Sequence, residues 1–141
     1  MPIQICMLAE TNLTILLRSL NPQLGPDDYV FCSVPVGREV DLLRDAWAII
    51  RESEGVTLIL TRDAADRHHL PYESVFRRIT LRVFSSLDAV GLTATVSARL
   101  AERHLSVNVV AGYYHDHIFV PSGDAERAFE AIEELGAEAG D

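Results

Sequence analysis

Side chains capable of acid–base chemistry or metal binding gather in one short stretch near the end of the chain. Tyr113, Tyr114, His115, Asp116 and His117 occupy consecutive positions. A structural zinc site needs four convergent donors, and a catalytic site three. In a strand only His115 and His117 would share a face, with Asp116 pointing away. The stretch is therefore more typical of a hairpin turn at His115-Asp116 than of a metal site.

Catalysis by the same stretch is the alternative that stays open. A small enzyme using His115, Asp116 and His117 would need a nucleophile or a bound metal nearby. The sequence contains no G-x-S-x-G, P-loop or G-x-G-x-x-G motif. We therefore expect no catalytic residues, no metal and no cofactor.

The loop from Ser85 to Gly91 is a second candidate, because it joins an expected strand to an expected helix. A helix N-terminus offers unpaired N–H groups and a partial positive charge, which suit a ligand carboxylate. Gly91 would allow close approach to the backbone, and Asp88 could face an α-amino group. The alternative is that Ser86 or Asp88 only caps the helix and Gly91 only relieves crowding.

Asn108 is a third candidate, because it is a polar amide between Val107 and Val109 in an expected strand. Alternation along a strand directs its side chain to the face opposite both valines. It fits a ligand contact and a surface position about equally well.

The second half of the chain has the pattern strand, helix, strand, strand, helix. Apolar residues alternate in the first strand and recur at helical spacing in the first helix. The expected elements are a strand over 76–84, a helix over 92–104, strands over 106–114 and 118–121, and a helix after Asp124. A β-α-β-β-α-β sheet would need one more strand. Ile3 to Leu8 could supply that strand, or it is absent.

The first half repeats this theme with shorter elements. A strand over Ile3 to Leu8 precedes a helix that Thr11 or Asn12 could cap. The remaining expected elements are that helix over 13–20, a turn over 25–28, strands over 29–34, 47–51 and 56–60, and a helix over 63–68. The order predicts two related α+β modules, residues 1–70 and 71–141, with no flexible linker between them.

The pattern of the second half resembles the ACT domain. It consists of the loop Asp88-x-x-Gly91-Leu92, the helix after it, the strand Ser106 to Val110, and a hairpin that returns through Ile118 to Pro121. The chain as a whole is similar to paired ACT-domain proteins of bacteria, whose second module is akin to those of aspartokinase and of the cellular arginine sensor. The resemblance implies an α+β fold of two ferredoxin-like βαββαβ modules, with antiparallel sheets and helices on one face. The first β-α junction, Ala9 to Leu13, lacks the glycine, which puts a second identical site in doubt.

For function, the resemblance implies a regulatory protein that binds a small molecule, an amino acid, and has no catalysis of its own. The alternative is an interaction or structural module that has lost its ligand. The hairpin of such proteins lies near the ligand or the partner module, so Tyr113 and Asp116 join the expected site. The full set of expected ligand-binding residues is Ser86, Leu87, Asp88, Ala89, Val90, Gly91, Leu92, Asn108, Tyr113 and Asp116.

The composition and charge of the chain limit the kinds of partner it is expected to bind. The net charge is −9 and all 12 basic residues are arginine, with no basic patch, so nucleic acid is not expected and a lysine Schiff base is excluded. The N-terminus lacks the positive region of a secretory signal, and no apolar stretch approaches the roughly 20 residues of a membrane helix. Cys6 and Cys32 lie in apolar runs typical of buried thiols. We expect a cytoplasmic protein that forms a homodimer through sheet or helix pairing, because exposed strand edges favour such pairing.

Overall fold

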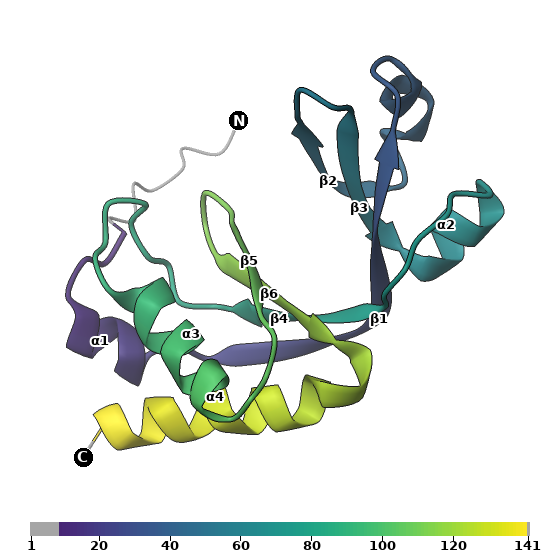
Figure 1. Cartoon of the computed structure of the whole chain (residues 1–141). Helices are drawn as coiled ribbons and strands as arrows, with labels where there is room; N and C mark the ends of the chain where they lie inside the picture. The colour runs from purple at the N-terminus through teal and green to yellow at the C-terminus, as the bar shows by residue number, and fades with distance from the viewer. Residues whose placement is uncertain (1–8, 141) are drawn as a thin grey trace.

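Six strands in the order β2-β3-β1-β4-β6-β5 form the sheet of the computed structural model, which describes residues 9–140 (Figure 1). Every neighbouring pair is antiparallel. The strands are β1 (Pro22–Val34), β2 (Ala46–Arg51), β3 (Val56–Thr61), β4 (Phe76–Leu81), β5 (Asn108–Ala111) and β6 (Asp116–Pro121). The helices are α1 (Leu13–Arg18), α2 (Arg62–Arg67), α3 (Leu92–Glu102) and α4 (Ala125–Ala139), with short 3-10 helices η1 (Arg38–Leu42) and η2 (Ser122–Asp124).

The predicted strand over Ile3 to Leu8, and Cys6 within it, lie outside the described residues. Among residues 9–140, no helix is long and apolar enough to cross a membrane. Cys32 is a buried free thiol, as its apolar surroundings in the sequence predicted.

Strand β1 is continuous through the segment where the sequence predicted a turn. The pairing with β4 shifts between Leu24, opposite Ile79, and Asp28, opposite Arg77, so residues 25–27 form a bulge and not a turn. Proline lacks the N–H that a regular ladder needs, and a bulge is one of the places where a strand accepts it. The Arg77 side chain donates to the Gly25 carbonyl oxygen from Nη2 at 2.6 Å and from Nε at 3.1 Å, which satisfies that acceptor within the bulge.

The two ends of β1 serve different halves of the sheet. Pro22 to Leu24, and Asp28 and Tyr29 beyond the bulge, pair with β4, whereas Tyr29 to Val34 pair with β3. Figure 1 shows β1 running along β4 and then turning up into the β2–β3 hairpin. The position beside β4, where the last strand of the second module is expected, is therefore held by the start of β1.

Two hydrophobic cores lie on one face of this sheet, and we call that face the helix-covered face. The first core gathers α1, α3 and α4 against β4 and β6, and includes Leu16, Ile79, Val96, Ile118 and Ile132. The second gathers α2 and Leu42 against β1 and β3. We call the elements around each core a unit. Because α1 and the start of β1 pack with α3 and α4, the unit around β2, β3 and α2 lies in the sequence between two parts of the other unit. The expected division at residues 70 and 71 stays a prediction.

The helices begin where their sequences provide a cap and an apolar stripe. Asn12 caps α1, as predicted, with its Oδ1 accepting from the Ile15 N–H at 3.1 Å. Helix α4 buries the predicted stripe, which includes Ala128, Ile132 and Leu135. A Cβ on Gly136 would lie 3.3 Å from the Leu17 carbonyl oxygen, so the glycine lets α1 approach α4 closely.

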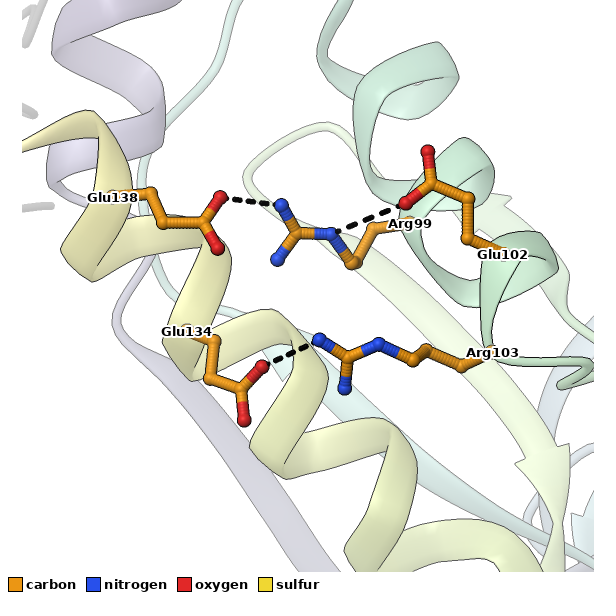
Figure 2. Close-up of polar contacts among 5 residues, drawn as sticks. All are labelled: Arg99, Glu102, Arg103, Glu134 and Glu138. Carbon is orange, nitrogen blue, oxygen red and sulfur yellow. Dashed lines mark hydrogen bonds and ion pairs between the residues drawn. The ribbon is translucent and has the colours of Figure 1, made fainter.

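Ion pairs join α3 to α4 across their exposed edge (Figure 2). Arg99 pairs with Glu138 on α4 and, at 3.7 Å, with Glu102 on its own helix. Arg103 Nη2 lies 2.6 Å from a carboxylate oxygen of Glu134. Since the carboxylates are more than half exposed, with 59% and 53% of the Glu138 and Glu134 side chains accessible, we expect these pairs to add little to stability.

Aromatic side chains fill the opposite, helix-free face of the sheet. Phe119 on β6 is buried and contacts Tyr29, Phe31 and Trp47, with ring centroids 5.6, 5.5 and 5.2 Å away. Trp47 lies on β2, four strand positions from β6, which would be about 19 Å in a flat sheet. The contact is possible because the sheet curls strongly around this cluster.

The hairpin between β5 and β6 differs in detail from its prediction. Asp116 is the first residue of β6, paired with Ala111, and the Gly112 N–H donates to the His115 carbonyl oxygen at 2.9 Å. The tip of the turn is therefore Tyr113-Tyr114, and the predicted turn at His115-Asp116 is wrong by two residues. The predicted strands over 76–84 and 106–114 also end early, at Leu81 and Ala111.

Candidate functional site

The loop between β4 and α3 is held in place by the segment that precedes α1. The Glu10 N–H donates to the Phe84 carbonyl oxygen, and the Ser86 N–H donates to the Glu10 carbonyl oxygen, both at 3.0 Å. Within the loop, the Ser86 hydroxyl accepts from the Asp88 N–H at 3.1 Å. Ser86 therefore shapes the loop and does not cap the helix.

Helix α3 begins without a side-chain cap. Its N-cap is Gly91, with φ of 100°, and within residues 9–140 no side-chain cap hydrogen bond is made there. The backbone N–H groups of Leu92 and Thr93 thus keep the partial positive charge of a helix N-terminus. The interpretation that Ser86 or Asp88 caps this helix is wrong.

Gly91 has two structural reasons to be glycine. Its φ lies in the region that residues with a Cβ rarely adopt. A Cβ there would also lie 3.1 Å from Leu13 Cδ2 on α1. The close approach predicted at Gly91 is thus an approach of α1.

Asp116 places a carboxylate beside this helix end. It starts β6 opposite Leu81 and Ala111, and it lines the same hollow as the buried Ser85. Burial raises the pKa of Asp116 above its usual value, against smaller opposing effects of His115 and Ser85. The site therefore holds one partly desolvated acid next to a helix N-terminus.

These groups line a small hollow that we call the loop pocket, of about 90 Å³. Its lining residues are Ser85, Ser86, Leu87, Ala89, Leu92, Thr93, Ala111 and Asp116. Five predicted residues are thus brought together: Ser86, Leu87, Ala89, Leu92 and Asp116. Ser85, Thr93 and Ala111 also line it and were not predicted, although hairpin pairing with Asp116 could have indicated Ala111.

The other predicted residues lie outside the lining of the loop pocket. Asp88 is exposed, and Val90 is 83% exposed. Tyr113 is 71% exposed, with its ring 6.4 Å from that of Phe84. Asn108 lies on the other face of the sheet, as its alternation with the neighbouring valines predicted.

Asn108 lines a second and larger hollow of about 480 Å³, which we call the inter-unit groove. Its other lining residues are Phe31, Ser33, Pro71, Tyr72, Glu73, Ser74 and Phe76. They come from β1, β4, β5 and the segment that precedes β4, so both halves of the sheet contribute to it.

The two histidines of the hairpin make separate contacts. His115 Nδ1 lies 3.3 Å from the Val83 carbonyl oxygen, and His117 Nδ1 lies 3.0 Å from Thr80 Oγ1. Burial, and then the positive charge of Arg78, lower the pKa of His117 to about 4, so its ring is neutral near pH 7. No group of three or more His, Cys, Asp or Glu residues within 9–140 is placed to hold a metal ion.

Comparison with protein families gives two matches in tandem. Models of the ACT domain match residues 8–77 and residues 73–134. A search among curated proteins gave no match.

Solved structures share the arrangement. A protein of unknown function from Vibrio cholerae, described as a possible transport protein, is 44% identical over 88% of this chain and 95% of its own, with a TM-score of 0.79. A protein from Agrobacterium tumefaciens is 15% identical, with a TM-score of 0.69 over 82% of this chain and 87% of its own. The ligand-free regulatory subunit of aspartate kinase from Thermus thermophilus is 10% identical, with a TM-score of 0.61 over 83% and 97%. The last two similarities concern the fold alone.

Proposed function

The chain belongs to the ACT-domain family, with two such domains in tandem, and from this we propose that it is a regulatory protein that binds an amino acid. The observation that carries the proposal is the loop pocket, where the Asp116 carboxylate lies beside the uncapped N-terminus of α3. We further propose that the protein has no catalysis of its own and acts in the cytoplasm. The two ACT-domain matches support a regulatory role, and the regulatory subunit of aspartate kinase shares this fold.

The two charges of the loop pocket complement those of a zwitterion. The ligand carboxylate would accept from the N–H groups of Leu92 and Thr93, and its ammonium group would pair with Asp116. A simple amine or a simple carboxylic acid would use only one of these contacts. The pocket therefore favours α-amino acids over either analogue.

The small volume of the loop pocket limits what it encloses. About 90 Å³ suits the α-amino and α-carboxylate groups of a ligand, with its side chain extending toward the exposed rim. Leu87 and Tyr113 are 67% and 71% exposed, so neither side chain fills the pocket. This exposure supports ligand binding over the alternative of an interaction module that has lost its ligand.

Exposed apolar side chains near the loop pocket support the proposed homodimer. Leu87, Val90 and Tyr113 are apolar or aromatic and mostly exposed, Leu87 lines the pocket, and we propose that the three form one patch beside it. A second copy packed on this patch would enclose the ligand side chain and bury the apolar surface. Pairing along the edge strands β2 and β5 is the other arrangement available to the sheet.

The proposal is tested by measuring thermal stability with each of the twenty amino acids, followed by calorimetry on those that stabilise. A ligand at 100 times its Kd should stabilise the fold by about 2.7 kcal/mol. We expect Asp116→Asn to remove this effect and Asp88→Asn, a matched change at an exposed acid, to retain it.

The design separates the possible roles of the chain. Binding of no amino acid below millimolar concentration would overturn the proposal and leave the interaction module. If Asp88→Asn loses amino-acid binding and Asp116→Asn retains it, the ligand's ammonium group contacts Asp88 in the exposed loop and not Asp116. Equal binding of an amino acid and its decarboxylated amine would refute the contact with α3.

A further inference from the structure

The inter-unit groove has the dimensions of a small-molecule site and is separate from the loop pocket. Its volume of about 480 Å³ falls in the range of roughly 300–1,000 Å³ that is typical of ligand pockets. Asn108 at one end of β5 lines the groove, whereas Ala111 at the other end lines the loop pocket. The two residues are about 10 Å apart along the strand and point to opposite faces of the sheet.

Strand alternation brings the groove's side chains to one place. Phe31 and Ser33 on β1, Phe76 on β4 and Asn108 on β5 all project from the helix-free face, and residues 71–74 form a wall beside them. The groove thus lies where the two units meet, a common location for ligand sites.

The apolar lining of the groove is aromatic and held in place. The rings of Phe31 and Phe76 meet edge to face, with centroids 5.3 Å apart. The Tyr72 hydroxyl donates to Asp66 Oδ1 at 2.8 Å and accepts from Arg62 Nε at 3.2 Å, which fixes its ring as one side of the groove. Aromatic faces bind flat apolar groups and attract cations.

Three polar side chains of the lining have no hydrogen-bond partner among the described residues. Glu73 is the only charged residue of the lining. Within residues 9–140, the side chains of Glu73, Asn108 and Ser33 form no hydrogen bond or ion pair. The Glu73 carboxylate attracts an ammonium group and repels a carboxylate ligand, and the Asn108 amide oxygen and the Ser33 hydroxyl can accept from the same ammonium group.

We propose that the inter-unit groove binds a small organic amine with an aromatic or apolar body. Its ammonium group pairs with Glu73 and donates to Asn108, and its body packs on Phe31, Phe76 and Tyr72. Because the groove's lining comes from both units and from the segment joining them, the bound amine stabilises their relative placement. This site is independent of the amino-acid site proposed above.

Calorimetry with three probes of similar size tests the proposal: phenethylamine, 2-phenylethanol and phenylacetate. We expect phenethylamine to bind the wild-type protein at least tenfold more tightly than phenylacetate, with the alcohol between them. Glu73→Gln should remove this preference, and Asn108→Asp should strengthen it several-fold. Asp116→Asn, which alters only the loop pocket, should leave it unchanged.

Several results would overturn the proposal. These are no binding of phenethylamine at 10 mM, equal binding of the three probes, or an unchanged preference in Glu73→Gln. Loss of the preference in Asp116→Asn alone would place the amine in the loop pocket, which refutes the groove and leaves the amino-acid proposal intact. Circular dichroism of each variant separates these outcomes from unfolding, and Asn108→Asp tests the site by a gain of affinity.

Discussion

His117 makes the stability of this fold depend on pH between about 4 and 6.5. Its ring lies on the helix-free face, 4.8 Å from the Trp47 ring, with Nδ1 in hydrogen-bond contact with Thr80. Burial and the nearby positive charges of Arg78, His115 and Arg82 lower its pKa from 6.5 to about 4. The folded state therefore holds this histidine neutral well below the pH at which the unfolded chain protonates it.

The sign and size of the effect follow from proton linkage. Above pH 6.5 the ring is neutral in both states and His117 costs nothing. As the pH falls from 6.5 toward 4, the His117 ring binds a proton in the unfolded state but not in the folded state, so the free energy of unfolding decreases. Between pH 7 and pH 5 the loss reaches about 2 kcal/mol, or about 1 kcal/mol if solvent screens the partly exposed ring.

Urea unfolding at pH 7 and pH 5 measures this loss, with His117→Gln as the variant. We expect the wild-type free energy of unfolding to fall by about 1–2 kcal/mol more than that of the variant over this range. Asp45 and Glu138, whose pKa values are lowered by hydrogen bonds to His68 and Arg99, lose stability on acidification in both proteins and cancel.

A matched control and a direct titration sharpen the result. His104 is exposed with φ of 59°, which asparagine tolerates, so His104→Asn should keep the wild-type pH dependence. In NMR the His117 ring should titrate near pH 4. A midpoint near 6.5, or an equal pH-dependent loss in wild type and His117→Gln, would refute the reasoning.

Three further substitutions test the packing by urea unfolding. Phe119→Ala should cost about 3–5 kcal/mol and shift the emission of Trp47, the only tryptophan, because Phe119 joins both halves of the aromatic cluster; an unchanged emission spectrum would contradict this contact. Gly91→Ala should cost about 1–2 kcal/mol through its positive φ, whereas Gly123→Ala, with nothing within 4 Å, should cost less than about 0.5 kcal/mol; equal costs would argue against strain at Gly91. Arg103→Gln should cost less than about 1 kcal/mol, and less still in 0.5 M salt, because its ion pair is exposed; a salt-independent loss would indicate packing instead.

Local sequence signals predicted the elements well where one residue type decides the structure. The Asn12 cap, the apolar stripe of α4 and the fold of two ACT domains in tandem are confirmed. The segment 25–28 was misread because glycine, proline and aspartate favour a turn and a bulge alike. Only pairing with β4 on both sides of the segment decides between them, and that pairing is not local.

The candidate site was predictable where local sequence decides it, and not where it depends on strand pairing. The loop after β4 was identified from its place before a helix, and five of its predicted residues line the loop pocket. The choice between Asp88 and Asp116 for an ammonium contact depends on hairpin register, because one residue along β6 moves a side chain to the other face. The contact between Trp47 and His117 depends on the curl of the whole sheet, which no short segment encodes.

The shared strand β1 explains why the two units are not independent modules. Its first residues complete the sheet beside β4, and its last residues pair with β3. The aromatic cluster draws Trp47 from one unit and Phe119 from the other, and Tyr29 lies between them on β1. Separating the units would therefore expose this cluster and break the ladder on one side of β1. A ligand bound in the proposed site of the inter-unit groove would pack against Phe31 on β1. Its binding free energy would therefore stabilise the arrangement of the two units that β1 connects.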